Sequence, residues 1–199
     1  MRSAENFSKL LLAKDLGVLA NPLWDLENGD VVERSASKIV KALSSFLVEA
    51  KEIHIVDPHF AFEKARCRIL LEELSVVATR VGCREVSLML HVHGERTGTF
   101  AFFEQQASEF AKKLPIGCTV KFSRWLDDPG GERFHNRYVL TDLGGVKCGD
   151  GIEDGQPGQT DDFNILSIAQ YEHRWKIFVQ GNGLKFVDAP STIHGTKQL

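Results

Sequence analysis

Apolar residues follow the period of a helix in three stretches of the chain, at 35–50, 62–81 and 103–114. In each stretch they recur every three or four positions, which places them on one face of a helix. Ser35 is a suitable N-terminal cap for the first stretch, and Pro115 ends the third. The pattern therefore predicts three amphipathic helices, each with one buried face.

Short runs of β-branched and other apolar residues stand between these helices, at 52–58, 86–92 and 119–122. The first run ends in Asp57-Pro58, which is typical of a strand followed by a turn. Helices that alternate with strands favour crossover connections and a largely parallel sheet with helices on both faces. We expect an α/β fold in which 53–56 and 86–90 are inner strands.

The pattern changes after the turn-rich segment 127–131. Five short strands and no long helix are expected beyond it, near 138–141, 146–148, 165–169, 175–179 and 184–187. The segment 149–162 is rich in Gly and Asp, and we interpret it as a mobile surface loop. Together these elements predict a mixed sheet of six to eight strands with helices on both faces.

The 199 residues contain no linker-like segment that would divide them, so we expect one domain. It would consist of a helical N-terminal segment 1–34, a core 35–188 and a C-terminal tail 189–199. The composition, 43% hydrophobic and 26% charged, is that of a globular protein. A net charge of −3 removes the simplest argument for a duplex-binding protein, although it leaves room for a local basic groove.

The four cysteines, Cys67, Cys83, Cys118 and Cys148, stand singly, without a CxxC pair. This spacing suggests neither a metal site nor a disulfide framework, and it favours buried thiols in a reducing compartment. The longest apolar runs are far below the ~20 residues of a membrane span, and the first residues lack the apolar core of a signal peptide. We expect a cytoplasmic protein without a membrane span, metal or cofactor.

Three residues that suit phosphate chemistry follow the spacing H-x-R-x4-D, namely His135, Arg137 and Asp142. Alternate residues of a strand point to the same face, so His135 and Arg137 can address one phosphate together. The planar guanidinium of Arg137 can bind two phosphate oxygens. The motif thus predicts a nucleophile and a positively charged phosphate ligand in one site.

This spacing resembles the H-x-K-x4-D signature of the phospholipase D superfamily, with Arg137 where lysine is usual. The run Ile53 to Phe60 is also similar to the strand that opens many phospholipase D-like domains, so the resemblance covers about 35–188. It implies a phospholipase D-like fold in which His135 forms a phosphohistidine, Arg137 holds the phosphoryl oxygens and Asp142 is an orienting or supporting carboxylate. The reaction it implies is metal-independent phosphodiester hydrolysis, in the first place by a nuclease.

A second interpretation is a binding or assembly module. Phe134 to Arg137 followed by Gly149 to Ile152 is similar to the phospholipase D-like domain at the C-terminus of MIT-domain proteins, whose role resembles binding rather than hydrolysis. Asp150 would also place a carboxylate near the phosphate. The family's chemistry uses two histidine motifs, so a chain with one motif is expected to form a two-fold homodimer. A flavodoxin-like regulatory domain would explain the alternation of helices and strands, although not the strand-rich C-terminal third.

Other residues are weaker candidates. Asp57, Lys147, Asp150 and His173 are predicted to bind phosphate or line the site, and Asp57 is equally suited to form a turn. We assign structural roles to His59, His91 and His93. The run Glu172 to Trp175 leads into a predicted strand with Trp175 as a sheet residue, although an aromatic beside an Arg can also bind a phosphate chain. Arg124 and Arg133 could extend a positive patch toward a nucleic acid or another phosphodiester.

Overall fold

The computed structural model describes residues 29–80 and 85–198, and within them one mixed sheet of nine strands carries the fold. The elements in chain order are β1 (Asp30–Glu33), α2 (Ala36–Glu49), β2 (Ile53–Val56), α3 (Ala65–Arg80), β3 (Val86–His93), the 3₁₀ turn η4 (Gly94–Arg96), α4 (Phe100–Phe110), the 3₁₀ turn η5 (Ala111–Lys113), β4 (Cys118–Leu126), β5 (Arg137–Thr141), β6 (Gly144–Cys148), β7 (Thr160–Ile165), α5 (Ile168–Phe178), β8 (Lys185–Phe186) and β9 (Ser191–His194). The predicted mixed α/β sheet is confirmed, with one strand more than the expected six to eight.

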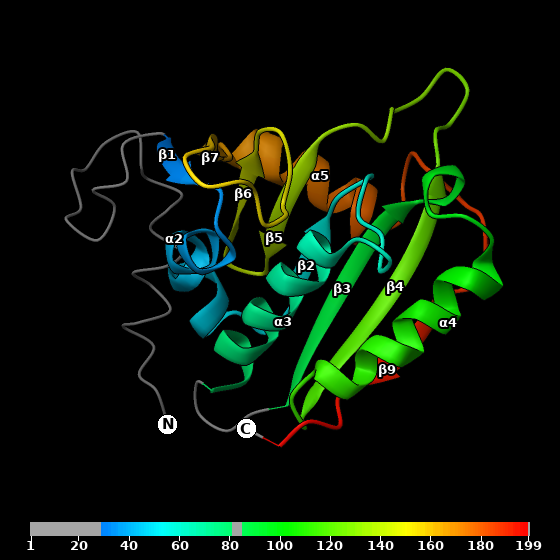
Figure 1. The fold of residues 1–199 in the computed structure, drawn as a ribbon. Coiled ribbons are helices and arrows are strands. Elements are labelled where there is room, and N and C mark those ends of the chain that lie inside the picture. The colour runs from blue at the N-terminus through cyan, green and yellow to red at the C-terminus, as the bar shows by residue number, and fades with distance from the viewer. Residues whose placement is uncertain (1–28, 81–84, 199) are drawn as a thin grey trace, which may run out of the picture.

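The sheet has an antiparallel half and a parallel half, which meet at β2, and in the parallel half only the short strands β8 and β9 run antiparallel to their neighbour β4. The strand order is β1-β7-β6-β5-β2-β3-β4-β8, and β9 also pairs with β4. Strands β2, β3 and β4 are parallel, as Figure 1 shows, whereas β5, β6, β7 and β1 each run antiparallel to their neighbours. Because Val56 pairs with both His91 and Tyr138, the ends of β2 and β3 and the start of β5 meet at one edge of the sheet.

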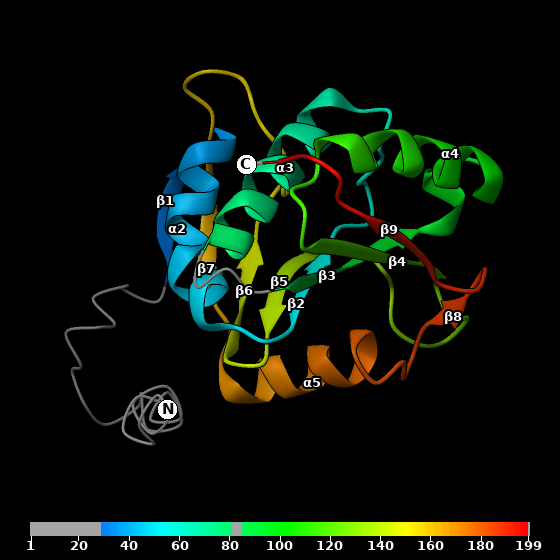
Figure 2. The same cartoon turned by 90° about the horizontal axis from the view of Figure 1, so that it is seen from below.

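Helices cover both faces of the sheet, as predicted. Helices α2, α3 and α4 lie on one face and α5 lies on the other (Figure 2). Side chains alternate along β2, so Ile53 and Ile55 belong to the larger core beneath the three helices, whereas Val56 belongs to the smaller core beneath α5. All four residues of β2 are buried, which confirms it as an inner strand.

The amphipathic pattern of α2 is confirmed, because Ile39, Leu43 and Leu47 are fully buried. Its capping differs from the prediction. Within the described residues, the side chain of Ser35 makes no capping hydrogen bond. Instead, the Ala36 amide donates to the carboxylate of Asp154 at 2.8 Å, which is 118 residues away. The start of α2 is therefore stabilised by the long segment that follows β6.

The predicted strands at 165–169 and 175–179 are wrong, because α5 occupies Ile168–Phe178. Ser167 and Gln170 form a reciprocal capping box at its start. The helix is tied to β5, since the Tyr171 hydroxyl donates to the Thr141 carbonyl at 2.7 Å. The aromatic residues that suggested a strand pack against the sheet at helical spacing. The C-terminal third therefore contains a helix of 11 residues that the sequence analysis excluded.

The segment 149–162 is held in place, contrary to the predicted mobile loop. Ile152 is fully buried in the larger core. The carboxylate of Asp161 accepts hydrogen bonds from the amides of Asp150, Gly151 and Asp162. The last residues of the segment belong to β7. A carboxylate that satisfies several backbone amides substitutes here for regular secondary structure.

The ends of the chain also differ from the prediction. Residues 1–28 of the expected helical segment lie outside the described residues, and Asp30–Glu33 form strand β1. The expected tail contains β9, which pairs with β4. The cysteines Cys67, Cys118 and Cys148 are buried and free, as predicted, whereas Cys83 lies outside the described residues. The sheet thus extends beyond the predicted core at both ends.

A buried chain of hydrogen bonds crosses three strands beneath α5. Trp125 Nε1 donates to His91 Nδ1 at 3.1 Å, so a neutral His91 carries its proton on Nε2, which lies 3.0 Å from His54 Nδ1. Trp175 of α5 packs edge-on against the His54 ring, and Phe178 packs against His91. Burial lowers the pKa of His54 to about 4 and that of His91 well below its usual value. Both imidazoles are therefore neutral at pH 7.

We predict that this buried chain of hydrogen bonds makes the stability of the fold sensitive to acid. The unfolded histidines bind protons below about pH 6.5, whereas folded His54 resists protonation until about pH 4. Stability is therefore lost as the pH falls between these values, by about 2 kcal/mol from His54 alone at pH 5. Urea unfolding at pH 7 and pH 5 measures the loss. His54→Leu should show a smaller loss than wild type, and His194→Gln, at an exposed position, should show the same loss as wild type. An equal loss in His54→Leu would contradict the prediction.

Candidate functional site

The candidate site lies at the edge of the sheet where β2 and β3 end and β5 begins (Figure 1). Asp57 follows β2, and η4, which ends in Arg96, follows β3. His135 lies in the turn just before β5, whose first residue is Arg137. Open α/β sheets commonly bind ligands outside the carboxyl ends of their parallel strands. Residues from three separate segments of the chain therefore converge at this edge.

The centre of the site is a buried carboxylate beside an incompletely paired guanidinium. The Asp57 Oδ1 atom accepts a hydrogen bond from the His59 amide at 2.8 Å, and Oδ2 accepts one from the Ile152 amide at 3.4 Å. Arg137 Nε lies 3.8 Å from Asp57 Oδ1, beyond hydrogen-bond distance, and is buried without an acceptor among the described residues. Burial raises the pKa of Asp57, while the His59 amide and Arg137 oppose that rise.

Further basic groups surround this pair. Arg96 Nη1 lies 2.9 Å from His59 Nε2, and Lys64 Nζ donates to the His59 carbonyl at 2.7 Å. Burial, followed by the positive charges of Arg137, Arg96 and Lys64 and by His135, lowers the pKa of His59 to about 4. We call the set His59, Lys64, Arg96, His135 and Arg137 the basic edge. It combines three permanent positive charges with two imidazoles.

The segment 149–155 packs beside Asp57 and helps to position its carboxylate. Its Ile152 amide binds Asp57, and Glu153 forms ion pairs with Arg34 at 3.3 Å and with Arg66 at 2.9 Å. The Cys67 thiol also lies 3.7 Å from the Glu153 carboxylate. These contacts fasten the segment to the residues that precede α2 and to the first turn of α3. The position of the Asp57 carboxylate is consequently fixed from both sides.

The structure brings together three of the predicted site residues, Asp57, His135 and Arg137. It does not bring Asp142 to them. Asp142 follows the opposite end of β5, where its Oδ1 atom accepts hydrogen bonds from the amides of Lys51 and Glu52 at 2.8 and 3.2 Å. Its carboxylate therefore holds the start of β2, at the far end of the strand from the basic edge.

The remaining predicted residues lie elsewhere. Lys147 pairs with Tyr138, whose ring packs against α5, so Lys147 projects from the face opposite to Arg137. His173 is on α5 and lies 3.5 Å from the Glu132 carboxylate. Asp150 follows β6 at the same end of the sheet as Arg137, and its amide binds Asp161. No interaction among the described residues joins its side chain to the basic edge.

Several polar residues outside the motif make hydrogen bonds within the protein and belong to its structure. His93 is buried and accepts a hydrogen bond from the Glu95 amide, as its assigned structural role requires. Arg124 is buried and donates to Asp188 at 2.8 Å, so it adds no positive charge to the basic edge. Arg174, in the run expected to be a strand, is helical and donates to Glu132 at 2.6 Å. These side chains are satisfied within the protein.

Sequence reasoning missed three members of the basic edge. His59 was interpreted as a packing residue, and neither Lys64 nor Arg96 was singled out. The signal that could have found Arg96 is its place directly after an inner strand of a parallel sheet, where ligands commonly bind. The signal for Lys64 is weaker, because it lies in a turn seven residues after Asp57. Only the fold shows that these segments converge.

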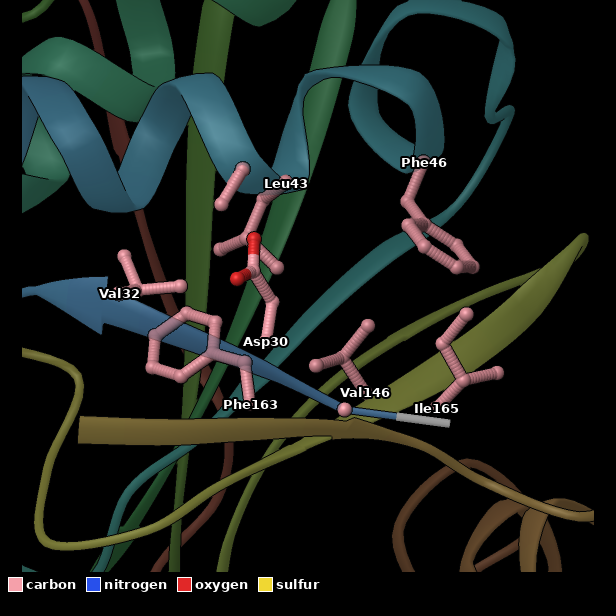
Figure 3. Close-up of a pocket in the computed structure, with 9 residues that line it drawn as sticks. Asp30, Val32, Leu43, Phe46, Val146, Phe163 and Ile165 are labelled. Carbon is pink, nitrogen blue, oxygen red and sulfur yellow. The ribbon is translucent and has the colours of Figure 1, made fainter. Parts of the chain in front are cut away.

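A separate apolar crevice lies between α2 and the strands β1, β6 and β7 (Figure 3). Val32, Leu43, Phe46 and Phe163 are among its lining residues. Its volume of about 20 Å³ has room for about one water molecule. It shares no residue with the basic edge. We therefore interpret it as a packing defect beneath α2.

Comparisons with known proteins do not assign the chain to a family. No family model and no curated protein matches it. Among solved structures it is similar to TrmBL2, described as an archaeal chromatin protein with a novel mode of DNA binding, at a TM-score of 0.39 and 13% sequence identity. The match covers 89% of this chain and 60% of that one. A TM-score in this range does not establish a common fold.

None of the helices in 29–80 and 85–198 combines the length and the hydropathy that a bilayer crossing requires.

We predict that Asp142 contributes to stability and not to ligand capture. Asp142→Ala removes the acceptor for two backbone amides and should lower the free energy of unfolding by about 1 kcal/mol. Asp142→Asn keeps an oxygen acceptor and should lose less. Urea unfolding measures both variants. Phosphate-ligand binding, measured in parallel by NMR, should be unchanged in either. A large loss of binding with unchanged stability would show that Asp142 belongs to the site.

Proposed function

We propose that the basic edge captures the phosphate of a phosphodiester and that His135 attacks its phosphorus. The observation that carries this proposal is the state of Arg137. Its guanidinium lies against a buried carboxylate, yet its Nε atom has no hydrogen-bond acceptor among the described residues. A phosphate oxygen is the kind of acceptor that a guanidinium binds best. Lys64 and Arg96 add positive charge within the same edge.

The proposed reaction is a covalent displacement. His135 is exposed and precedes Arg137 by two residues, so its imidazole can approach a phosphorus held by Arg137. A nitrogen of His135 forms a bond to phosphorus while the bond to the leaving oxygen breaks, and that oxygen takes up a proton from solvent. Water then attacks the phosphohistidine, the nitrogen–phosphorus bond breaks, and the attacking water gives up a proton to solvent. The basic groups stabilise the charge on the phosphoryl oxygens, and the step needs no metal-activated water.

Binding without turnover is the second candidate function. The observation that favours it is that no described residue donates to or accepts from the His135 ring, and Asp142 lies at the opposite end of β5. A nucleophilic imidazole is normally oriented by a hydrogen bond to its other nitrogen. The same site would then be a phosphate receptor. The enzyme and the receptor differ only in the chemical step after capture.

The ligand we propose first is nucleic acid, in the cytoplasm. A chain of backbone phosphates suits an exposed cluster of basic groups. The net charge of −3 means that attraction must be local to the basic edge. Three free, buried thiols suit a reducing compartment.

The role of Arg137 separates the two candidate functions. If the chain is an enzyme, Arg137→Ala should remove about 2–4 kcal/mol of transition-state stabilisation and so lower kcat, whereas Arg137→Lys should retain turnover. If it is a receptor, neither wild type nor either Arg137 variant turns over substrate, and Arg137→Ala weakens phosphate binding by about 1.5–3 kcal/mol. The measurement is hydrolysis of bis(p-nitrophenyl) phosphate with chelator present, beside binding of a short single-stranded oligonucleotide.

Lys147→Gln is the matched control, because it removes one exposed positive charge from the opposite face of the sheet. It should leave both turnover and binding unchanged. His135→Gln should abolish turnover and leave the fold intact, since an exposed side chain contributes little packing. Turnover that persists in His135→Gln would eliminate His135 as the nucleophile. Absence of both turnover and binding in wild type would end the proposal of a phosphate site.

A two-fold homodimer remains our proposal for supplying a second His135 to each site. To test the homodimer, wild type and inactive His135→Gln protein are mixed in varying proportions, unfolded together and refolded, so that mixed dimers can form. If each site uses His135 from both chains, activity falls as the square of the wild-type fraction, because mixed dimers are inactive. If each chain carries its own site, activity falls in proportion to that fraction. The proportional result, or a monomer in sedimentation, would refute the shared site.

A further inference from the structure

The turn between β2 and α3 arranges its charged groups around His59. The His59 amide donates to Asp57, and the His59 carbonyl accepts from Lys64 Nζ. The ring nitrogen Nε2 faces Arg96 Nη1 at 2.9 Å. Each of these contacts comes from a group at the basic edge or from the carboxylate beside Arg137. His59 is therefore the contact point between Arg96 and the rest of the site.

The contact with Arg96 exists only while His59 is neutral. A guanidinium can only donate hydrogen bonds, so Nε2 must be the acceptor and the ring proton must be on Nδ1. An imidazolium carries protons on both nitrogens and can accept none. Protonation of His59 therefore breaks its hydrogen bond with Arg96. Arg96 itself is exposed on a short 3₁₀ turn, and a released guanidinium there can reorient.

We propose that neutral His59 keeps Arg96 hydrogen-bonded and away from the phosphate site in the free protein. Capture of a phosphate at the basic edge is then coupled to uptake of one proton by His59, which releases Arg96 toward the anion. This inference rests on the capture step of the proposed function and is independent of turnover. It makes His59 a positioning residue, which acts on the ligand through Arg96.

The charges that face His59 explain the coupling. Lys64, Arg96, Arg137 and His135 surround it with positive charge or potential positive charge, and Asp57 is the carboxylate in contact with its turn. Without a ligand, a further positive charge on His59 is strongly disfavoured, and burial together with these cations keeps its pKa at about 4. A phosphodiester brings one negative charge into the cluster. That charge offsets the repulsion and stabilises the imidazolium.

The sign of the pH dependence follows from this coupling. The pKa of His59 is higher in the bound protein than in the free protein, so protonation favours the bound state. Affinity should therefore increase as the pH falls from above the bound pKa toward the free value of about 4. The expected rise in the pKa is at least about one unit, which corresponds to a gain in affinity of about twofold or more between pH 7.5 and pH 5.

The experiment follows the imidazole Cε1–H signals of the histidines by NMR from pH 5 to pH 8, with and without dimethyl phosphate. Dimethyl phosphate keeps a single negative charge over this range, so it takes up no proton itself. In the free protein the His59 signal should barely titrate. In saturating dimethyl phosphate it should titrate clearly, whereas addition of dimethyl phosphate should leave the signal of the exposed His194 unchanged.

Two variants test the mechanism. His59→Gln keeps an oxygen that can accept from Arg96 but cannot be protonated, so binding should persist and lose the part of its pH dependence due to His59. Arg96→Gln removes the charge and the donor, so it should raise the pKa of His59 in the free protein and reduce the further rise on binding. Lys147→Gln is again the matched control and should behave as wild type in both respects.

The outcomes distinguish this inference from the proposed function. If dimethyl phosphate shifts the His135 signal and the His59 pKa does not change, capture stands and the coupling is overturned. An unchanged pH dependence of binding in His59→Gln would overturn it as well. If no signal at the basic edge responds to dimethyl phosphate or to an oligonucleotide, both the capture and the coupling are overturned. The amide spectrum at each pH confirms that every protein compared is folded.

Discussion

The buried carboxylate of Asp57 is the group on which the arrangement of this edge depends. It stands where the parallel half of the sheet meets the antiparallel half, directly after the strand that pairs with both. Its two oxygens fix the turn at His59 and the segment at Ile152, and its charge holds Arg137 close without fully pairing it. A buried carboxylate needs such partners, because an uncompensated one would be strongly unfavourable. The geometry of the site is thus a consequence of satisfying one acidic group.

The two faces of β2 bury different kinds of side chain. Toward the three helices the strand presents Ile53 and Ile55, which need no partners. Toward α5 it presents His54, whose ring is linked to His91 and through it to Trp125. The first face gains stability from apolar area alone, whereas the second depends on tautomers and neutrality. Along β2, the side chains toward the three helices are therefore indifferent to pH, whereas His54, toward α5, is not.

The sequence predicted the first half of the fold well, because long apolar periods leave little choice between helix and strand. It failed at α5, where Tyr171, Trp175 and Phe178 lie at helical spacing within a short aromatic run that also suits a strand. In the motif, the period of a strand begins only at Arg137, because His135 lies in the turn before β5. The same strand carries Asp142 away, since five residues of β5 extend about 16 Å. Lys64 and Arg96 could not be found without the fold, because their proximity depends on which strands pair.

The cap of α2 has a consequence for the order in which the chain acquires its structure. Ala36 belongs to the first helix described, yet the carboxylate that accepts its amide hydrogen bond is Asp154. Strand β1 likewise pairs with β7, which lies more than a hundred residues later. During synthesis, the ribosome must release most of the chain before either contact can form, whereas β2, β3 and β4 can pair earlier. The amino-terminal part of the fold is therefore made first and completed last, and closing it across so long a loop slows folding.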